Sequence, residues 1–463
     1  MADETKTVSV IGLGKLGACL AAGLASKDLE VIGVDVHQDV VEAVNRGQAP
    51  VQEPGLQDVM TAHRARLHAT RSYREAVRRS SITFVLVPTP SDRRGGFSLR
   101  YVLPAIRRIG RALATKPDYH VVVVVSTVLP GALRADIIPA LETASGKRCG
   151  VDLGVCYSPE FVALGSVLRD LLRPDFVLIG ESDIRAGDQL AACLRVLCGI
   201  NTPMARMNLV NAELTKLAVN SYVTMKISFA NLLATLCEQL PEGDIDTVTR
   251  GLGLDARIGP KYLKGALGYG GPCFPRDNRA MALLAKQLGC DETLPLATHR
   301  FNEAQPQRLL ETLRRHVAPA STIAVLGLAY KPHTPVIEAS QGLALARLLT
   351  EEGYAVTVYD PLALEQARTV LGGTATYASS VRAAICQADA VIVTNPLEEV
   401  VALSSEEFPD RGKPIVVLDC WRLLQHRLVD PKRFLYLAVG LGNTRRRMAA
   451  RAARTATRVV ARA

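Results

Sequence analysis

The sequence predicts an α/β protein with two doubly wound parallel-sheet domains joined by a long central helix. Short, unbroken apolar runs alternate with helical segments in the first part of the chain, and the same alternation returns near residue 321. Unbroken runs are typical of strands buried on both faces, as in a parallel sheet covered by helices. With 463 residues, 48% hydrophobic and 22% charged, the chain has the composition of an ordinary globular protein.

The expected strands of the first block lie at 7–11, 30–34, 82–87, 120–125, 155–160 and 176–180. Those of the second block lie at 322–328, 355–360, 390–394 and 414–419. Between the blocks, residues 208–240 lack proline and have helical periodicity, which predicts a helix of about 45–50 Å. Glycine and proline then cluster over 251–275, as in an ordered loop.

This pattern divides the chain into four parts. We expect a first sheet domain at 1–207, a helical dimerisation region at 208–318, a second sheet domain at 319–440 and an arginine-rich tail at 441–463. The tail carries seven arginines after residue 444 and no acid, within an overall net charge of +10. A contact of this tail with an anionic membrane surface is one reading, but a solvated terminus is the simpler one and no nucleic-acid partner is expected.

The composition excludes several classes of protein. The apolar run 121–125 is far shorter than the roughly 18 residues of a membrane span. The chain enters its first strand at once, which argues against a secretory signal. Its ten cysteines show no CxxC and no metal spacing, so we expect reduced thiols, a cytoplasmic location and no metal.

A glycine fingerprint follows the first strand and opens a helix. It consists of Gly12, Leu13, Gly14, Lys15, Leu16 and Gly17. Glycines at this spacing allow a tight turn and a close approach to a pyrophosphate, as in the dinucleotide-binding Rossmann fold. Asp35 ends the second strand, where a carboxylate accepts ribose hydroxyls and repels a 2′-phosphate. The sequence therefore predicts NAD as cofactor, and both sheet domains are expected to be Rossmann-like.

Three further segments contain candidate catalytic residues. Cys273 lies in a loop rich in glycine and proline, with Asp277 four residues on, which suits an oriented thiolate. Lys216 and Asn220 are four apart on the long helix and so share a face. Thr127 follows the strand 120–125, at the edge where this fold binds ligands. Spacing alone leaves a structural alternative open for each of them. Cys273 could be a packed thiol, Lys216 and Asn220 a solvated pair, and the hydroxyl after strand 120–125 a helix cap.

Taken together, these motifs resemble the UDP-glucose/GDP-mannose dehydrogenase family, the nucleotide-sugar 6-dehydrogenases. The resemblance runs from residue 8 to about 440. In chain order it is carried by VIGLGKLG, EPGL from Glu53, VPTP with Pro88 and Thr89, STV, SPEF, ELTK, GYGGPCFPRD and GLAYKP. The 3-hydroxyacid dehydrogenases share the cofactor domain, but they account for neither Cys273 nor the second sheet domain.

The resemblance implies a four-electron oxidation of a sugar CH₂OH to a carboxylate with two NAD. Cys273 would form a thiohemiacetal and then a thioester, and Lys216 would stabilise the oxyanion. Asn220, Asp277 and Thr127 would position oxygen and water. Pro88 and Thr89 would contact the cofactor together with Thr127.

The resemblance also assigns a substrate set and a partner. The substrate would be a UDP-hexose, either UDP-glucose or a UDP-N-acetylhexosamine. Its contacts would come from Glu160, Phe161, Leu164, Lys216, Asn220, Arg257, Tyr262, Tyr269, Gly270 and Lys331. Arg257 would reach the site of a neighbouring subunit, since the family dimerises through the central helix.

One position departs from the family pattern. The family carries a second glutamate four residues after the glutamate of SPEF, and here that position is Leu164. A hydrocarbon cannot accept a proton, and a positioned base supplies roughly 10²–10⁴-fold, or about 3–5 kcal/mol. Either Glu160 or Asp277 replaces this base, or the enzyme stops at the aldehyde or the acyl-enzyme. The remaining alternative is a non-catalytic protein that binds NAD and a sugar nucleotide.

Overall fold

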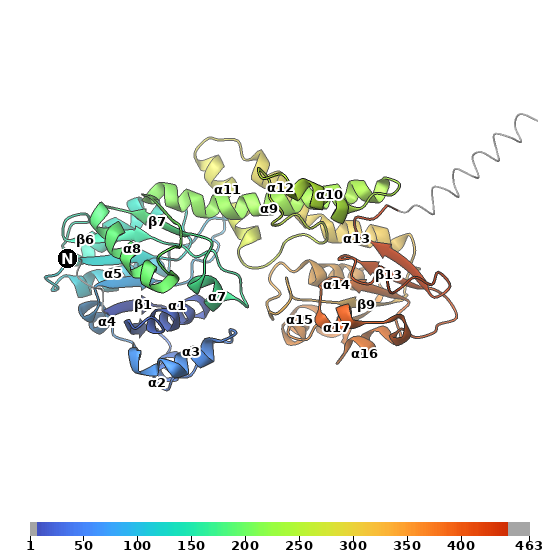
Figure 1. The fold of residues 1–463 in the computed structure, drawn as a ribbon, viewed down its shortest axis with the longest axis horizontal. Helices are drawn as coiled ribbons and strands as arrows, with labels where there is room; N and C mark the ends of the chain where they lie inside the picture. The colour runs from blue at the N-terminus through green and yellow to red at the C-terminus, as the bar shows by residue number, and fades with distance from the viewer. Residues whose placement is uncertain (1–6, 443–463) are drawn as a thin grey trace, which may run out of the picture. The chain divides into compact units, whose positions relative to one another are not determined.

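The computed structural model describes residues 7–442 and divides the chain into two compact units. The first unit comprises Met1–Val219 and Leu283–Gly289, and the second comprises Asn220–Ala282 and Cys290–Ala463. Each unit holds one Rossmann-like sheet (Figure 1), so the predicted fold class is confirmed. The four-part division of the sequence remains a prediction, and the arginine-rich tail lies outside the described residues after Gly442.

The first unit is built on an eight-stranded sheet with the order β3-β2-β1-β4-β5-β6-β7-β8. All neighbours are parallel except β6 and β7. The strands are β1 (Thr7–Ile11), β2 (Glu30–Val34), β3 (Leu67–Thr70), β4 (Ile82–Val85), β5 (His120–Val124), β6 (Leu153–Tyr157), β7 (Val177–Glu181) and β8 (Met204–Asn208). The pattern missed β3 and β8, which are edge strands and carry few fully buried apolar side chains.

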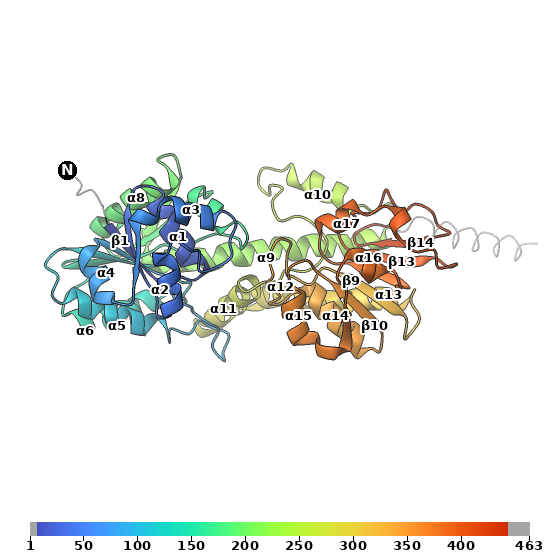
Figure 2. The ribbon, with the colours of Figure 1, turned by 90° about the horizontal axis from the view of Figure 1, so that it is seen from below.

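Helices cover both faces of this sheet. One face carries α1 (Lys15–Ala25), α7 (Val167–Leu172) and α8 (Ile184–Cys198), and the other carries α4 (Tyr73–Arg79), α5 (Val102–Leu113) and α6 (Ile138–Ser145). Figure 2 shows α4, α5 and α6 grouped on one side of the unit. Two shorter helices, α2 (Gln38–Asn45) and α3 (Leu56–Ala62), follow β2. Strand β5 shows why its apolar run is unbroken, since Val121 and Val123 pack on one face and Val122 and Val124 on the other.

The second unit contains a six-stranded parallel sheet with the order β11-β10-β9-β12-β13-β14. The strands are β9 (Thr322–Leu326), β10 (Ala355–Tyr359), β11 (Ala375–Tyr377), β12 (Ala390–Val393), β13 (Ile415–Asp419) and β14 (Phe434–Ala438). Its sheet helices are α14 (Gln341–Glu351), α15 (Leu364–Leu371), α16 (Val381–Ile385) and α17 (Glu398–Ala402). The connecting helices are α10 (Ile245–Gly253), α11 (Phe274–Gln287), α12 (Thr293–Glu303) and α13 (Gln305–Arg314).

The central helix α9 spans Leu209–Gln239, 31 residues, which confirms the long helix expected at 208–240. Its burial pattern is unusual, because several of its polar side chains are inside and several large apolar ones are outside. The buried polar residues include Glu213, Lys216, Asn220, Thr224 and Asn231. The exposed apolar residues on the helix are Leu214, Tyr222, Phe229, Leu232 and Leu236. No helix among residues 7–442 is long and apolar enough to cross a membrane.

Candidate active site

The glycine loop of the first unit has the geometry of a phosphate cradle. Gly12 has φ +93°, and a Cβ on it would lie 2.6 Å from the Leu86 carbonyl oxygen. A Cβ on Gly17 would lie 1.8 Å from the Gly12 carbonyl oxygen, so helix and strand meet only through glycine. A Cβ on Gly14 would meet nothing within 4 Å, which leaves its backbone open for a pyrophosphate. Helix α1 begins at the next residue, Lys15, and directs its free N–H groups toward this opening.

Asp35 directly follows strand β2 and lies beside this loop. One carboxylate oxygen accepts the N–H of Leu13 at 2.8 Å, and the other accepts the N–H of His37 at 3.0 Å. The carboxylate therefore stands at the carboxyl edge of the sheet, next to the glycine loop. The residues of this edge fit a bound NAD, with the loop for the pyrophosphate and Asp35 for the ribose hydroxyls.

The other predicted cofactor contacts lie in loops at the same edge. Pro88 and Thr89 follow β4, and Thr127 follows β5. The two loops are tied together, because the Ser126 hydroxyl donates to the Val87 carbonyl oxygen at 2.6 Å. Parallel neighbouring strands place the loops after β1, β4 and β5 on one side of the sheet, as the doubly wound fold requires.

Lys216, Glu160 and Phe161 form a second group in the first unit. The Lys216 ammonium donates to the Glu160 carbonyl oxygen at 2.6 Å and lies 4.4 Å from the centre of the Phe161 ring. Burial raises the pKa of the Glu160 carboxyl to about 7, against the opposing effect of the Lys216 charge. The structure thus brings together a cation and a carboxyl group that exchanges its proton near neutral pH.

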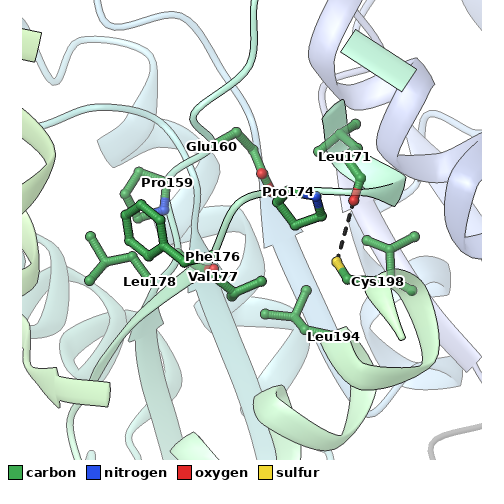
Figure 3. Close-up of a pocket in the computed structure, with 11 residues that line it drawn as sticks. Pro159, Glu160, Leu171, Pro174, Phe176, Val177, Leu178, Leu194 and Cys198 are labelled. Carbon is green, nitrogen blue, oxygen red and sulfur yellow. Dashed lines mark hydrogen bonds between the residues drawn. The ribbon is translucent and has the colours of Figure 1, made fainter. Parts of the chain in front are cut away.

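Figure 3 shows the surroundings of Glu160. Together with Pro174, Leu194 and Cys198, it lines a cavity of about 10 Å³, about the size of one water molecule. The Cys198 thiol donates to the Leu171 carbonyl oxygen at 3.3 Å across this cavity. These apolar walls explain why the charged form of Glu160 is disfavoured.

Leu164 packs against the core of the first unit and does not substitute for the missing carboxylate. The loop that carries it is held by Glu53, whose carboxylate accepts the N–H groups of Gly165 at 3.2 Å and Val167 at 2.8 Å. Sequence reasoning noticed Glu53 only as part of the EPGL motif. Its role as an anchor becomes visible only when residues more than one hundred positions apart are brought together.

Cys273 lies in the second unit, directly before the first residue of α11, and its thiol is exposed. Its carbonyl oxygen accepts the N–H of Asp277 at 2.8 Å, which makes Cys273 the first residue of the helical turn. The positive end of a helix favours a thiolate over a thiol. The side chain of Cys273 is therefore exposed at the start of a helix rather than packed in a core, and its role as nucleophile stays a prediction.

Asp277 and Asn220 are brought together behind this turn. The Asn220 amide donates to an Asp277 carboxylate oxygen at 2.6 Å, and the Arg276 guanidinium lies 3.4 Å from the other oxygen. Asp277 is only 1% exposed. A buried carboxylate with these two donors can hold and orient an oxygen ligand.

The glycines before Cys273 permit close packing. A Cβ on Gly270 would lie 2.5 Å from the Ala339 carbonyl oxygen, and the N–H of Gly271 donates to the Glu338 carbonyl oxygen at 2.8 Å. Tyr269 is buried, and its hydroxyl accepts from the Asn278 amide at 2.9 Å. The loop is therefore held on both sides by backbone contacts that a larger residue would exclude.

Three further predicted substrate contacts, Arg257, Tyr262 and Lys331, lie in the second unit. Arg257 is exposed and pairs with Asp255 at 2.6 Å, and Tyr262 is exposed with φ +62°. Lys331 lies in the loop after β9, with its ammonium 5.8 Å from the Tyr330 ring. Their roles, and those of the other site residues, remain predictions.

The described residues hold no cluster of three metal-binding side chains, and none of the ten cysteines, all of which are described, forms a disulfide.

Comparison with known proteins places this geometry in context. Three domain models of the UDP-glucose/GDP-mannose dehydrogenase family match the chain in order. They are the NAD binding domain at residues 6–197, the central domain at 210–304 and the UDP binding domain at 324–426.

Individual relatives and a solved structure agree with these matches. UDP-glucose 6-dehydrogenase AglM of Haloferax volcanii is 37% identical over 424 residues, covering 91% of this chain and 97% of the relative. GDP-mannose 6-dehydrogenase of Pseudomonas aeruginosa is 32% identical and covers 86% and 89%. A UDP-glucose dehydrogenase structure from Pyrobaculum islandicum superposes with a TM-score of 0.85, at 34% identity, covering 95% of this chain and 99% of that one.

The position of Asp35 generates a first prediction. Replacing Asp35 with Ser removes a charged acceptor for the ribose hydroxyls, worth about 1.5–3 kcal/mol. We expect NADH binding to weaken roughly 10- to 100-fold, while NADPH binding weakens less or improves. Fluorescence titration with both cofactors measures this. Asp39→Asn, at an exposed carboxylate on α2, is the matched control, and unchanged NADH affinity in Asp35→Ser would contradict the assignment.

Proposed function

Because the chain belongs to the UDP-glucose/GDP-mannose dehydrogenase family and is therefore an NAD-dependent nucleotide-sugar 6-dehydrogenase, we propose that it oxidises the C6 alcohol of a UDP-hexose to the uronic acid. The observation that carries this proposal is the exposed thiol of Cys273 at the start of α11, in front of the buried Asn220–Asp277 pair. UDP-glucose and UDP-N-acetylhexosamines are the proposed substrates. The 37% identity to a UDP-glucose 6-dehydrogenase, against 32% to a GDP-mannose 6-dehydrogenase, favours uridine over guanosine.

The reaction requires two oxidations and one hydrolysis. Bound NAD would supply the hydride acceptor for both oxidations, first of the C6 alcohol and then of the adduct on Cys273. Between them, the Cys273 thiolate adds to the C6 aldehyde and forms a thiohemiacetal, which becomes a thioester when hydride and proton leave. Water then attacks the thioester carbon, the carbon–sulfur bond breaks, and the thiolate is regenerated with release of the carboxylate.

The polar side chains have distinct roles in these steps. Lys216 stabilises the negative charge that develops on the C6 oxygen, and a fixed cation is most effective where water is excluded. Asn220 and Asp277 hold the oxygen or the attacking water, in keeping with their short hydrogen bond. Thr127, at the carboxyl end of β5, positions water from the cofactor side.

Glu160 is the proposed proton acceptor in place of the carboxylate missing at position 164. Its pKa of about 7 allows it to take a proton from water and release it again at neutral pH. The Lys216 ammonium donates to the backbone carbonyl oxygen of Glu160. The proposed oxyanion donor, Lys216, is therefore hydrogen-bonded to the residue that carries the proposed base. If Glu160 does not act, the alternative is an enzyme that stalls at the aldehyde or at the thioester on Cys273.

The exposed apolar residues of α9 support a homodimer. Tyr222, Phe229, Leu232 and Leu236 follow each other at intervals of seven, three and four residues, so they form one stripe along the helix. Apolar area of this kind is normally covered, and a second copy offers a matching stripe across a two-fold axis. In such a dimer Arg257, with its exposed guanidinium, would reach the substrate of the partner.

The stoichiometry of the reaction tests the main proposal. With UDP-glucose, UDP-N-acetylglucosamine, UDP-N-acetylmannosamine and GDP-mannose offered separately, we expect at least one UDP-sugar to yield two NADH per sugar. Cys273→Ala should abolish uronic acid formation, since no thioester can form. Absorbance at the NADH band and mass spectrometry of the product measure both. Absence of NADH with every sugar would refute the proposal.

Glu160→Gln tests the identity of the base. This variant should still form the thioester but hydrolyse it roughly 10²–10⁴-fold more slowly, because the amide cannot accept a proton. Intact-mass measurement should then show the acylated protein after a burst of NADH. Glu75→Gln, at a half-buried glutamate on α4, is the control and should behave as wild type.

The pH dependence of the unmodified enzyme gives a second view of the same group. Below pH about 7 the Glu160 carboxyl is protonated, so the hydrolysis rate should fall about tenfold for each further pH unit. Above that pH the rate should level off. A hydrolysis rate that does not change between pH 5 and pH 8 would rule out Glu160 as the base.

The dimer is tested by its mass in solution. The double variant Phe229→Glu, Leu236→Glu places two charges in the stripe and should shift the particle to the monomer mass of 49.8 kDa. Leu362→Glu, at an exposed leucine in the turn between β10 and α15, is the matched control and should leave the mass unchanged. Light scattering coupled to size exclusion measures both, and a wild-type protein of monomer mass would contradict the dimer.

A further inference from the structure

Residues 265–272 precede the nucleophile without forming a helix or strand, yet most of them are buried. Buried N–H and C=O groups outside secondary structure need partners, because an unpaired one costs about 1–3 kcal/mol. In this loop the partners include the Arg422 guanidinium on the Gly265 carbonyl oxygen, the Glu338 carbonyl oxygen on the Gly271 N–H, and side-chain amides from other parts of the second unit. Asparagine suits such a position because one amide carries both a donor and an acceptor.

Asn231 of α9 holds the first part of the loop. Its amide oxygen accepts the N–H of Ala266 at 2.9 Å, and its amide nitrogen donates to the Leu267 carbonyl oxygen at 3.0 Å. Asn231 is only 1% exposed. The side chain therefore uses both functions on neighbouring peptide groups, as a paired strand would do.

Asn302 of α12 holds the second part in the same manner. Its oxygen accepts the N–H of Tyr269 at 2.7 Å, and its nitrogen donates to the carbonyl oxygen of Tyr269 at 2.9 Å. A Cβ on Gly268 would lie 2.3 Å from the Asn302 oxygen, so only glycine admits the amide at this distance. The side chain of Tyr269 is held as well, by Asn278 of α11.

The two hydrogen bonds from Asn302 to the Tyr269 backbone lie four residues before Cys273. The segment between Tyr269 and Cys273 has little conformational freedom. Gly270 and Gly271 are packed against residues 330–339, and Pro272 has a fixed φ. A displacement of the Tyr269 backbone is therefore transmitted to the thiol rather than absorbed by the chain. Misplacing a reacting group by about 1 Å can cost about 10²-fold in rate.

We propose that Asn302, together with Asn231, is a positioning residue for the nucleophile, whose amide sets the location of Cys273 at the start of α11. Neither asparagine touches the reacting atoms in this account, and their effect passes through the loop backbone. The proposal rests on the proposed function for its meaning in catalysis. It concerns the placement of the thiol, which can be measured without any sugar or cofactor.

The chain offers a matched control in the first unit. Asn45, at the end of α2, forms the same pair of hydrogen bonds with Ala69. Its amide nitrogen donates to the Ala69 carbonyl oxygen at 2.9 Å, and its amide oxygen accepts the Ala69 N–H at 2.8 Å. Asn302→Leu and Asn45→Leu thus delete equivalent hydrogen bonds from equivalent backbone groups. Only the first is expected to affect the thiol.

The experiment measures alkylation by iodoacetamide, resolved for each cysteine by mass spectrometry, with exposed Cys386 as internal reference. In Asn302→Leu we expect Cys273 to react at least threefold more slowly than in wild type at pH 7. The rise of its alkylation rate with pH should be shifted to higher pH. Cys386 should be unaffected in both variants. With substrate, kcat should fall roughly 10²-fold while KM changes less than about threefold.

Asn302→Asp keeps the acceptor for the Tyr269 N–H and should lie between wild type and Asn302→Leu. If Asn302→Leu does not fold, the Cys273 alkylation rate and kcat of Asn302→Asp test the proposal instead. Unchanged Cys273 alkylation and unchanged kcat, with only a loss of thermal stability like that of Asn45→Leu, would overturn the proposal. If wild type showed no dehydrogenase activity but Asn302→Leu still altered Cys273 alkylation, the proposed function would fail and the positioning role would stand.

Discussion

The structure depends above all on the buried polar side chains of α9. Taking a charged or amide group out of water is unfavourable unless it is hydrogen-bonded, so each of these side chains demands a partner. Glu213 accepts the N–H groups of Gly131 and Leu133 at 2.7 and 2.9 Å, and Glu238 pairs with Arg308 at 2.8 Å. Polar side chains of this helix form contacts in both units. They are Glu213 and Lys216 in the first unit, and Asn220, Thr224, Asn231 and Glu238 in the second. One face of one helix therefore carries Lys216 in the first unit and Asn220, the partner of Asp277, in the second.

This arrangement reverses the ordinary amphipathic pattern. When the inward face of a helix is occupied by chemistry, its apolar residues are left on the outward face, and Phe229 and Leu236 are about half exposed. The polar residues of α9 thus occupy its inward face and the apolar stripe its outward face. The dimerisation and the catalytic roles that we propose would both depend on this single helix.

The two sheets show how one topology serves two purposes. In the first, the loop after β1 is glycine-rich and open at Gly14, and Asp35 stands beside it with a half-buried carboxylate. In the second, a single oxygen of buried Asp360 accepts the N–H groups of Leu328 and Ala329 at 2.8 and 3.0 Å. The second loop therefore has two backbone donors satisfied by its carboxylate, whereas in the first loop Asp35 accepts only the N–H of Leu13.

Much of the fold could be predicted because its signals are local. Uninterrupted valines in β5, the Gly12–Gly17 spacing and the proline-free run of α9 each depend on residues close in sequence, and each was confirmed. The residue types of the site were equally visible, including Cys273, Asp277 and the hydrocarbon at position 164. Other features were decided by the tertiary structure alone. Apolar walls surround Glu160 and bring its pKa to about 7, and Glu53 anchors a loop more than one hundred residues away. Asn302 forms hydrogen bonds with the backbone of Tyr269. These are properties of burial and of long-range hydrogen bonds, which arise only when distant segments are packed together and water is excluded.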